Sequence, residues 1–476
     1  MLGTVARLEW RNLMAERTPL AAAVVLALAI GYGAYNGSAW VGFQDEAIAA
    51  ARAEEAKRFG ELKANITLAA TGAKKFSAFN EPRSPATVGR AAGVRYAVMP
   101  PAPLAALAVG QSDLYPYYFK VSTGSKQTFV NNDEIENPVH LLAGHFDLAF
   151  VIVYLLPLVI LAFTYNLISA EKEAGTLAMT LSQPVELRRV ALVKAGVRAV
   201  FLLGLATALT AAGVVLGGAE LVTPDGWMRL AWCLGVTIAY GAFWFALAIA
   251  VNALGRSSAT NAIALFGLWL VLVVFVPSVL SVVVQTLYPV PSRVEMIQAM
   301  RVASDDAARQ GSQLLARYLE DHPELAPKGA PVADFATLNI AVTDAVERKV
   351  QPVLDRFDRQ VSSQQAFVDR FRFASPAITA QAAFNDLAGA SASRYQHFLA
   401  QTDRFHRTWR EHLIPRALRK EQLAVADVDQ LPVFRFAEEP SGAVSSRVLA
   451  DVAGLVVPLS LLALAATRWL RRYPVA

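Results

Sequence analysis

The side chains that most often carry chemistry are sparse in this sequence and poorly spaced for it. The phosphate-binding pattern GxxxxGK[ST] and the zinc-binding pair HExxH do not occur. His406 and His412 are six residues apart, a spacing that does not share a helical face well, and we expect them and His397 to be solvated rather than zinc ligands. GQSDL around Ser112 lacks the second glycine of a nucleophile elbow. The sequence therefore predicts neither catalysis nor a resident cofactor or metal in this chain.

One charged stretch stands out, EKEAGTLAMTLSQPVELRR, which lies between two apolar runs. Glu171 and Glu173 begin it, Gly175 and Pro184 delimit a short helical piece, and basic residues end it. A short helix with a polar face, held between two membrane helices, is suited to receive mechanical force from a soluble partner. A plain connecting loop explains the same residues, so both interpretations stay open at this point.

Apolar runs long enough to cross a bilayer occupy much of the chain. Of its 476 residues, 55% are apolar and 17% charged, which is outside the usual range for a soluble globular protein. A bilayer core of about 30 Å needs roughly 20 apolar residues as helix, and unbroken runs exclude the alternating pattern of a barrel strand. Six such runs predict transmembrane helices at 19–40, 147–169, 191–218, 230–254, 259–287 and 447–468.

Lys and Arg residues gather on one side of these six predicted spans. They precede the first span, lie between the second and third and between the fourth and fifth, and follow the sixth in the tail 469–476. Because basic residues mark cytoplasmic loops, both termini are predicted to be cytoplasmic. The net charge of +5 is then a topology signal and requires no nucleic acid.

Residues 1–18 are predicted to form an amphipathic helix in the membrane interface. Leu2, Ala6, Trp10 and Leu13 recur at helical spacing opposite two arginines. A cleaved signal peptide is the alternative, but the segment is too long and too mixed in charge for an ordinary basic leader. We therefore expect this face to contact membrane lipid.

Two large insertions fall outside the cytoplasm in this topology. Residues 41–146 begin helically and become rich in proline and aromatic residues, whereas 288–446 are mainly helical, with Pro352 expected to end or kink one helix. Cys233 is the only cysteine, so disulfides within the chain are excluded. The predicted fold is mainly α: a polytopic membrane protein with six transmembrane helices plus a mixed and a mainly helical extracytoplasmic domain.

Polar and proline residues inside the apolar runs have structural explanations. Asn252 and Asn261 lie near span ends, where we expect hydrogen bonds between helices. Pro157, Pro277 and Pro458 each remove a backbone donor and are expected to kink their helices.

The segment NLISAEKEAGTLAMTLSQPVELRRVALVKAG resembles the corresponding stretch of type-two ABC transporter permeases. In that family a carboxylate-rich start, Gly-Thr-Leu and a Ser-x-Pro turn form the coupling helix, which docks in a groove of the ATP-binding subunit. The resemblance places this helix at 170–190. It implies ATPase-coupling roles for Glu171, Glu173, Gly175, Thr176, Leu177, Ser182 and Pro184.

The chain is also similar to a bacterial subgroup of these permeases with two large extracytoplasmic insertions. The stretches that carry this similarity begin PPAPLAALAVG, GHFDLAFVIVY and SPAITAQAAFN. The resemblance implies a bacterial inner-membrane subunit of an exporter, paired with a second copy or a sister permease. ATP and Mg²⁺ would bind in separate ABC ATPase subunits. The alternative is an ATP-driven mechanotransmitter that acts on a periplasmic or envelope partner without moving cargo.

Overall fold

The computed structural model describes residues 2–110, 112–113, 115–124, 146–183, 185–289, 293–323 and 335–473. It confirms the prediction of a mainly helical chain. Among the described residues, six helices are long and apolar enough to cross a membrane, as expected for a multi-pass membrane protein. These helices are Thr18–Ala70, Leu148–Glu173, Leu187–Leu216, Pro224–Asn252, Ser258–Leu287 and Ser441–Leu470.

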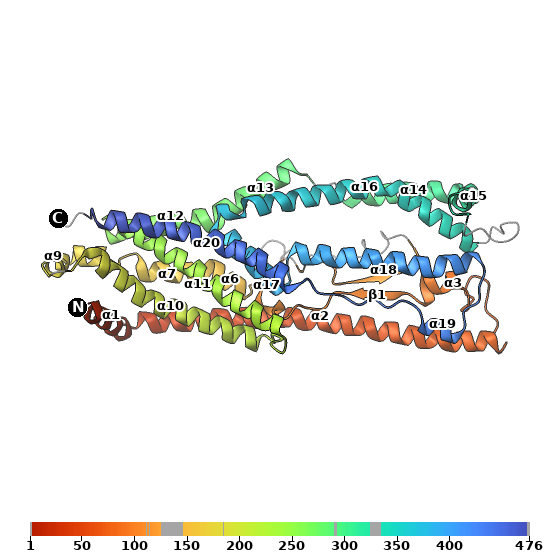
Figure 1. Ribbon diagram of the computed structural model, residues 1–476, viewed down its shortest axis with the longest axis horizontal. Coiled ribbons are helices and arrows are strands. Elements are labelled where there is room, and N and C mark those ends of the chain that lie inside the picture. Colours follow the sequence, from red (N-terminus) through yellow and green to blue (C-terminus); the bar gives the residue numbers. More distant parts are fainter. Residues whose placement is uncertain are drawn as a thin grey trace.

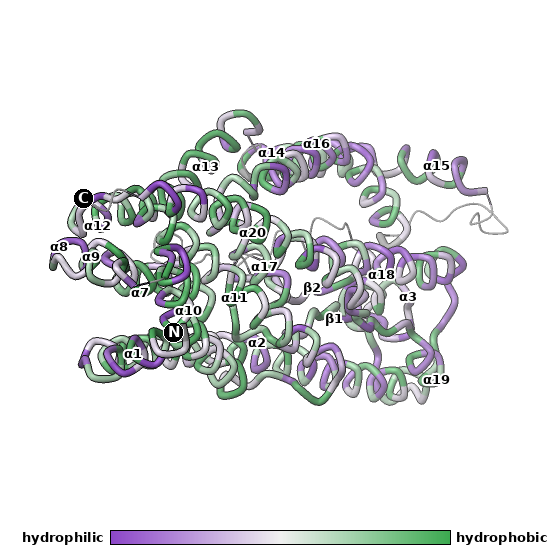
Figure 2. Tube along the Cα trace, turned by 60° about the vertical axis from the view of Figure 1, so that its left-hand side comes forward, coloured by the Kyte–Doolittle hydropathy of each residue, from purple (hydrophilic) through white to green (hydrophobic). Residues whose placement is uncertain are grey.

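The molecule is elongated, with an apolar helical bundle at one end and two longer projections at the other (Figure 1). Both termini lie at the free end of the bundle, which we call the termini end, and the projections leave from the opposite, insertion end (Figure 1). Figure 2 shows apolar residues concentrated around α7, α10, α11 and α12, and hydrophilic residues along α14, α15, α16 and α18. The two ends of the long molecule therefore differ in hydropathy: the bundle end is mainly apolar, and the end with the projections is more hydrophilic.

Helices in the bundle follow the predicted apolar runs, with interruptions at two prolines. The bundle consists of α1 (Leu2–Ala15), the first part of α2 (Thr18–Ala70), α6 (Leu148–Phe150), η3 (Val151–Leu155), α7 (Leu156–Thr164), α8 (Ser169–Glu173), α9 (Thr176–Leu181), α10 (Leu187–Leu216), α11 (Pro224–Asn252), α12 (Ser258–Trp269), η4 (Leu270–Phe275), α13 (Val276–Leu287) and α20 (Ser441–Leu470). The second span is thus α6, η3 and α7 in series, and the fifth is α12, η4 and α13.

Both interruptions are π-helical turns that precede a proline. Pro157 follows η3 and Pro277 follows η4, and proline cannot donate to a carbonyl one turn earlier. The Tyr240 hydroxyl donates instead to the Val153 carbonyl at 2.7 Å. In η4 the Leu272 carbonyl accepts a hydrogen bond from the Ser375 hydroxyl. Each wide turn therefore gains a side-chain donor from another element.

The first span continues far beyond the bundle as one uninterrupted helix. At about 1.5 Å per residue, the 53 residues of α2 extend roughly 80 Å. Its second half forms a distal body with α3 (Pro85–Thr87), η1 (Val88–Ala92), β1 (Arg95–Val98), β2 (Tyr118–Val121), α18 (Ala392–Leu418) and α19 (Val425–Asp429). The two strands pair antiparallel, with Arg95 opposite Val121. Phe59, Phe119, Phe398 and Trp409 pack in the core of this body.

A second projection, the arm, consists of α14 (Arg293–Arg309), α15 (Gly311–Asp321) and α16 (Phe335–Phe371). Pro352 lies inside α16, so the proline does not end this helix but removes one backbone donor from it. Leu315 and Tyr318 of the arm pack with Ile414 and Leu418 of α18. The arm therefore contacts the distal body far from the bundle.

Both insertions also contribute to the apolar core of the bundle itself. The short helix η2 (Ala105–Leu107) and the helix α17 (Pro376–Ala388) lie at the insertion end. Leu104 and Leu107 are fully buried there, as are Phe384 and Leu387 of α17, in the same cluster as the spans. The bundle core therefore extends into residues 41–146 and 288–446, which the sequence pattern treated as separate from it.

Polar contacts hold η2 and α17 in place. Asp147 accepts hydrogen bonds from the backbone of Val109 at 2.9 Å and of Phe150 at 2.7 Å. Arg229, which is 1% exposed, donates to the carbonyls of Asp386 and Leu387 at the end of α17. The two bonds from Arg229 satisfy carbonyls at the end of α17, where a helix C-terminus leaves them without intrahelical donors.

Gly37 of α2 allows η2 to approach closely, and Gly37→Ala should weaken this contact. An added Cβ would lie 2.0 Å from the Ala106 carbonyl oxygen, so the backbone would have to move. We expect a loss of roughly 1–3 kcal/mol in the free energy of unfolding, as for other overpacked sites. Gly31→Ala is the matched control, because its Cβ would meet nothing within 4 Å. Equal denaturation midpoints for the two variants would contradict this prediction.

The expectation that the three distal histidines are solvated is wrong for His406. This side chain is 4% exposed, and its Nε2 is 2.8 Å from the Gly124 carbonyl oxygen. Burial lowers the pKa of His406, so the neutral ring is favoured. His397 and His412 are partly buried. His397 Nε2 lies 3.0 Å from the Ala437 carbonyl oxygen.

Candidate functional site

The charged stretch between the second and third spans forms two short helices, α8 and α9, at the termini end (Figure 1). Gly175 separates them with φ of +72°, a conformation that glycine adopts without strain. An added Cβ would meet nothing within 4 Å, so glycine is required for backbone conformation and not for space. The turn lets α9 fold back instead of continuing α8.

Leu177 holds α9 against the bundle. Its side chain is 2% exposed. It packs in a cluster with Leu167, Ile168, Leu187, Ala191, Ala195, Ala253, Leu470 and Tyr473. The structure thus places Leu177 on the inner face of the segment, where it anchors α9 rather than meeting a soluble partner directly.

Two carboxylates connect α8 to different spans. Glu171 pairs with Lys194 of α10, and the two side chains are 28% and 13% exposed. Glu173 accepts hydrogen bonds from the Ser258 backbone at 2.7 Å and from the Ser258 hydroxyl at 2.9 Å, at the start of α12. A carboxylate at a helix N-terminus is favoured by the free N–H groups and by the helix dipole. Both carboxylates therefore bind within the chain.

A third connection reaches the end of α20. The Lys172 ammonium lies 5.8 Å from the centroid of the Tyr473 ring, within the range of a cation–π contact. Tyr473 is 7% exposed and shares the apolar cluster of Leu177. The segment α8–α9 is therefore joined to α10, α12 and the residues that follow α20.

Buried amides lie beneath α8 and support its position. The Asn252 amide donates to the Thr164 carbonyl at 2.8 Å, and the Asn261 amide lies 3.4 Å from the Ser169 hydroxyl. Ser169 in turn contacts the Ser258 hydroxyl at 2.8 Å. The expected interhelical bonding of the two asparagines is confirmed, and it connects the second, fourth and fifth spans directly under the segment.

The outward surface of the segment is small and mostly uncharged. Gly175, Thr176 and Ser182 are exposed, and Met179 projects with 73% exposure. The Ser182 hydroxyl donates to the Met179 carbonyl at 2.7 Å and so caps the end of α9. Pro184 lies outside the described residues. The segment therefore presents an apolar tip, Met179, to a partner, and the helices behind this tip are fixed to the bundle.

The N-terminal helix α1 packs on the same span that holds Glu171. Glu9 pairs with Arg198 of α10 at 2.7 Å, one helical turn from Lys194. Leu13 is buried, Ala6 is half-buried, and Trp10 is 43% exposed, with its ring nearly perpendicular to that of Phe201. The Leu2 side chain lies outside the described residues.

Of the predicted face of α1, Leu13 thus packs inward and Trp10 stays largely exposed.

Sequence reasoning missed Lys194, Arg198, Ser258 and Tyr473 as partners of the segment and of α1. Their basic, hydroxyl and aromatic types near span ends were the available signals. In the described part of the chain, no group of three or more His, Cys, Asp or Glu side chains gathers as a metal site would require.

A family profile described as a domain of unknown function, DUF3526, matches residues 293–437. This range contains the arm, α17 and α18 and ends before α20. A comparison with curated proteins gives no match. The matched part thus includes the helix that closes the insertion end of the bundle, and it leaves α8–α9 outside.

Proposed function

We propose that this chain is the membrane subunit of an ATP-driven ABC transporter and that α8–α9 is its coupling element. The observation that carries the proposal is the bracing of an exposed tip by α10, α12 and the chain after α20. A force applied at Met179 would reach several spans at once, because the carboxylates and Leu177 fix the segment to them. A plain loop would not need three separate attachments.

The rest of the assembly follows from the same proposal. Separate ABC ATPase subunits bind ATP and Mg²⁺ and dock under α9, and a second copy of the chain or a sister permease completes the membrane part. ATP binding can move the assembly only if ATP binds one of the assembly's two states more tightly, here the state in which the two ATPase subunits are closed together. Both termini are then cytoplasmic, the membrane is a bacterial inner membrane, and the distal body and arm are extracytoplasmic domains.

Reversing the Glu171–Lys194 pair tests the coupling role. Glu171→Lys should reduce ATPase stimulation roughly tenfold, the factor for a coupling of about 1.4 kcal/mol between two contacting residues. Glu171→Lys combined with Lys194→Glu should restore stimulation, since opposite charges again face each other. The assay is ATP hydrolysis by the reconstituted complex, with thermal unfolding to confirm that each variant folds. Full stimulation in Glu171→Lys would contradict the role.

The second candidate, a mechanotransmitter without cargo, is favoured by the closed insertion end. Leu104, Leu107, Phe384 and Leu387 fill the core there, and α2 continues from the bundle into the distal body as one helix. Movement of the spans would therefore shift η2 and α17 and, through them, the extracytoplasmic domains. In this version the chain acts on a periplasmic or envelope partner.

Thiol labelling of Cys233 distinguishes transport along a water-filled path within one chain from mechanical transmission without cargo. This residue is the only cysteine and is fully buried in α11. Transmission predicts that an impermeant maleimide does not label Cys233, with or without ATP turnover. Labelling during turnover alone would show that a water-filled path opens through the chain. Val222→Cys, at a position that is 95% exposed, is the positive control for reagent access from the insertion side.

A further inference from the structure

Helix α1 turns one face towards the bundle and the opposite face away from it. Glu9 and Leu13 lie one turn apart on the inner face, and both are buried. Arg7 and Arg11 are also one turn apart, and both side chains are exposed. Because two residues along a helix correspond to a rotation of about 200°, these arginines project on the side opposite Glu9 and Leu13. We call this basic side the outer face of α1.

Exposed apolar side chains flank the two arginines of the outer face. Leu8 lies on one side of them, and Met14 and Trp10 lie on the other. Figure 2 shows hydrophilic and hydrophobic residues together on α1, at the edge of the bundle. Basic side chains with apolar neighbours are typical of helices in the headgroup layer of a membrane, because the guanidinium reaches phosphate while the apolar side chains reach acyl chains.

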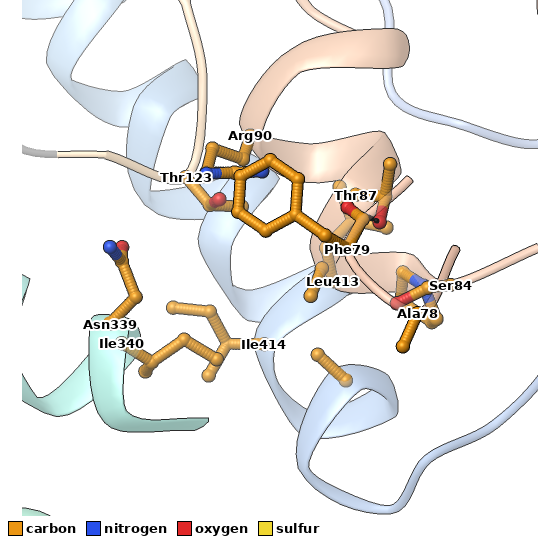
Figure 3. A pocket seen from close by; sticks show the side chains of 13 residues that line it. Ala78, Phe79, Ser84, Thr87, Arg90, Thr123, Asn339, Ile340, Leu413 and Ile414 are labelled. Carbon is orange, nitrogen blue, oxygen red and sulfur yellow. Dashed lines mark hydrogen bonds between the residues drawn. The ribbon is translucent and has the colours of Figure 1, made fainter. Parts of the chain in front are cut away.

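Within the described residues, no carboxylate pairs with the outer face of α1. Glu9, the only acidic residue of this helix, faces inward and pairs with Arg198 at 2.7 Å. The surroundings of Arg90 are different, since its guanidinium lies 4.2 Å from the centroid of the Phe79 ring, in a pocket of about 320 Å³ between the arm and the distal body (Figure 3). The two charges of the outer face are therefore accessible to an anion from outside the chain.

The position of α1 along the spans places its outer face near one boundary of the membrane core. At about 1.5 Å per residue, the part of α10 from Arg198, the partner of α1, to Leu216 measures roughly 27 Å. On α2, Trp40 lies roughly 30 Å beyond Leu20. Both lengths match a bilayer core of about 30 Å, with Trp40 at the boundary where aromatic side chains are frequent. In a bundle that spans the bilayer, α1 is thus at the headgroup level of the leaflet at the termini end.

We propose that the outer face of α1 binds the headgroups of anionic phospholipids in this leaflet. The guanidinium groups of Arg7 and Arg11 pair with phosphate oxygens, and Leu8 and Met14 contact the adjoining acyl chains. Arginine suits this role, because its planar group binds phosphate through two hydrogen bonds at once. Phosphatidylglycerol carries a net negative charge that phosphatidylcholine lacks, so the outer face should select phosphatidylglycerol. This binding requires no ATPase subunit and is independent of the coupling role of α8–α9.

Photoactivatable lipids measure this selectivity at α1 itself. Full-length protein would be placed in phosphatidylcholine nanodiscs that contain a small share of either phosphatidylglycerol or phosphatidylcholine with the same diazirine-bearing acyl chain. Mass spectrometry would then quantify the adducts on α1 and on α13, which has no charged residue and exposes Val279 and Val282. Phosphatidylglycerol should label α1 at least about fivefold more than phosphatidylcholine, the factor for one basic residue near an anionic surface, and the two should label α13 equally.

Two double variants locate the site. Arg7→Gln with Arg11→Gln should bring the labelling of α1 by the two lipids to within about twofold. Arg356→Gln with Arg359→Gln removes two exposed arginines of the arm and should keep the preference of the original chain. Thermal unfolding would confirm that each variant folds. An undiminished preference in the α1 variant would refute the assignment.

Two results with the original chain would also overturn lipid binding by the outer face. One is equal labelling of α1 by phosphatidylglycerol and phosphatidylcholine, which would show that the arginines select no headgroup charge. The other is the absence of adducts on α1 in nanodiscs in which α13 is labelled, because a protein surface and not lipid would then cover the outer face.

Discussion

Replacing Arg229 with methionine should lower the free energy of unfolding by about 3 kcal/mol. The guanidinium donates to Asp225 at 2.7 Å and to the carbonyls of Asp386 and Leu387 at 3.2 and 3.0 Å, and it is 1% exposed. Methionine keeps much of the volume but leaves these acceptors buried or half-buried without their donor. Removing one partner of a buried polar group costs several kcal/mol because the other partner stays desolvated.

The loss of stability should also affect the neighbouring helices. Asp386 accepts a hydrogen bond from Arg447 of α20 at 3.1 Å, and Arg447 pairs with Glu439 at 2.7 Å. The Arg229 group therefore joins α11, α17 and α20 at the insertion end. Denaturant titration of the purified protein measures the effect, with exposed Arg301→Met as the matched control. An Arg229→Met midpoint equal to that of the control would contradict this account of the joint.

Met179→Arg should abolish most ATPase stimulation without lowering stability. Met179 is 73% exposed at the tip of α9, so a charge there disturbs nothing inside the chain. In a docked complex the same charge would enter an apolar contact. A central contact of this kind contributes about 2 kcal/mol, which corresponds to roughly thirtyfold weaker docking.

The contrast with Val222→Arg makes this result specific. Val222 is also apolar and exposed, but it lies in the loop at the insertion end, away from α9. We expect Val222→Arg to retain stimulation and both variants to unfold at the same temperature as the original chain. Equal stimulation by the Met179→Arg and Val222→Arg proteins would argue against docking at α9.

The six long apolar helices could be predicted because span length follows directly from bilayer thickness. The same criterion missed α17, whose 13 residues are too short to cross a membrane although they pack with the spans. It also missed η2, since Leu104 and Leu107 stand in a proline-rich stretch that is typical of a loop. Both elements are buried by contacts with distant segments, which a length criterion cannot detect.

The position of the segment α8–α9 was likewise predictable, but its attachments were not. Gly175 ends α8 as its residue type suggests. Glu171, however, binds 23 residues away and Glu173 binds 85 residues away. Local spacing gives no information on such pairs, so the sequence does not predict that both carboxylates bind to other helices of the same chain. His406 is a similar case, because the backbone that it contacts is 282 residues earlier.

The most direct test of the central claim is photo-cross-linking from the tip of α9 in native membranes. A benzophenone amino acid would replace exposed Gln183, next to the end of α9, and a second protein would carry it at Val222 in the insertion-end loop. Mass spectrometry would then identify each adduct. If α9 docks on an ATPase subunit, position 183, and not position 222, should cross-link to a protein with the GxxxxGK[ST] phosphate-binding loop of an ATPase. Adducts from position 183 that contain no such protein would contradict it.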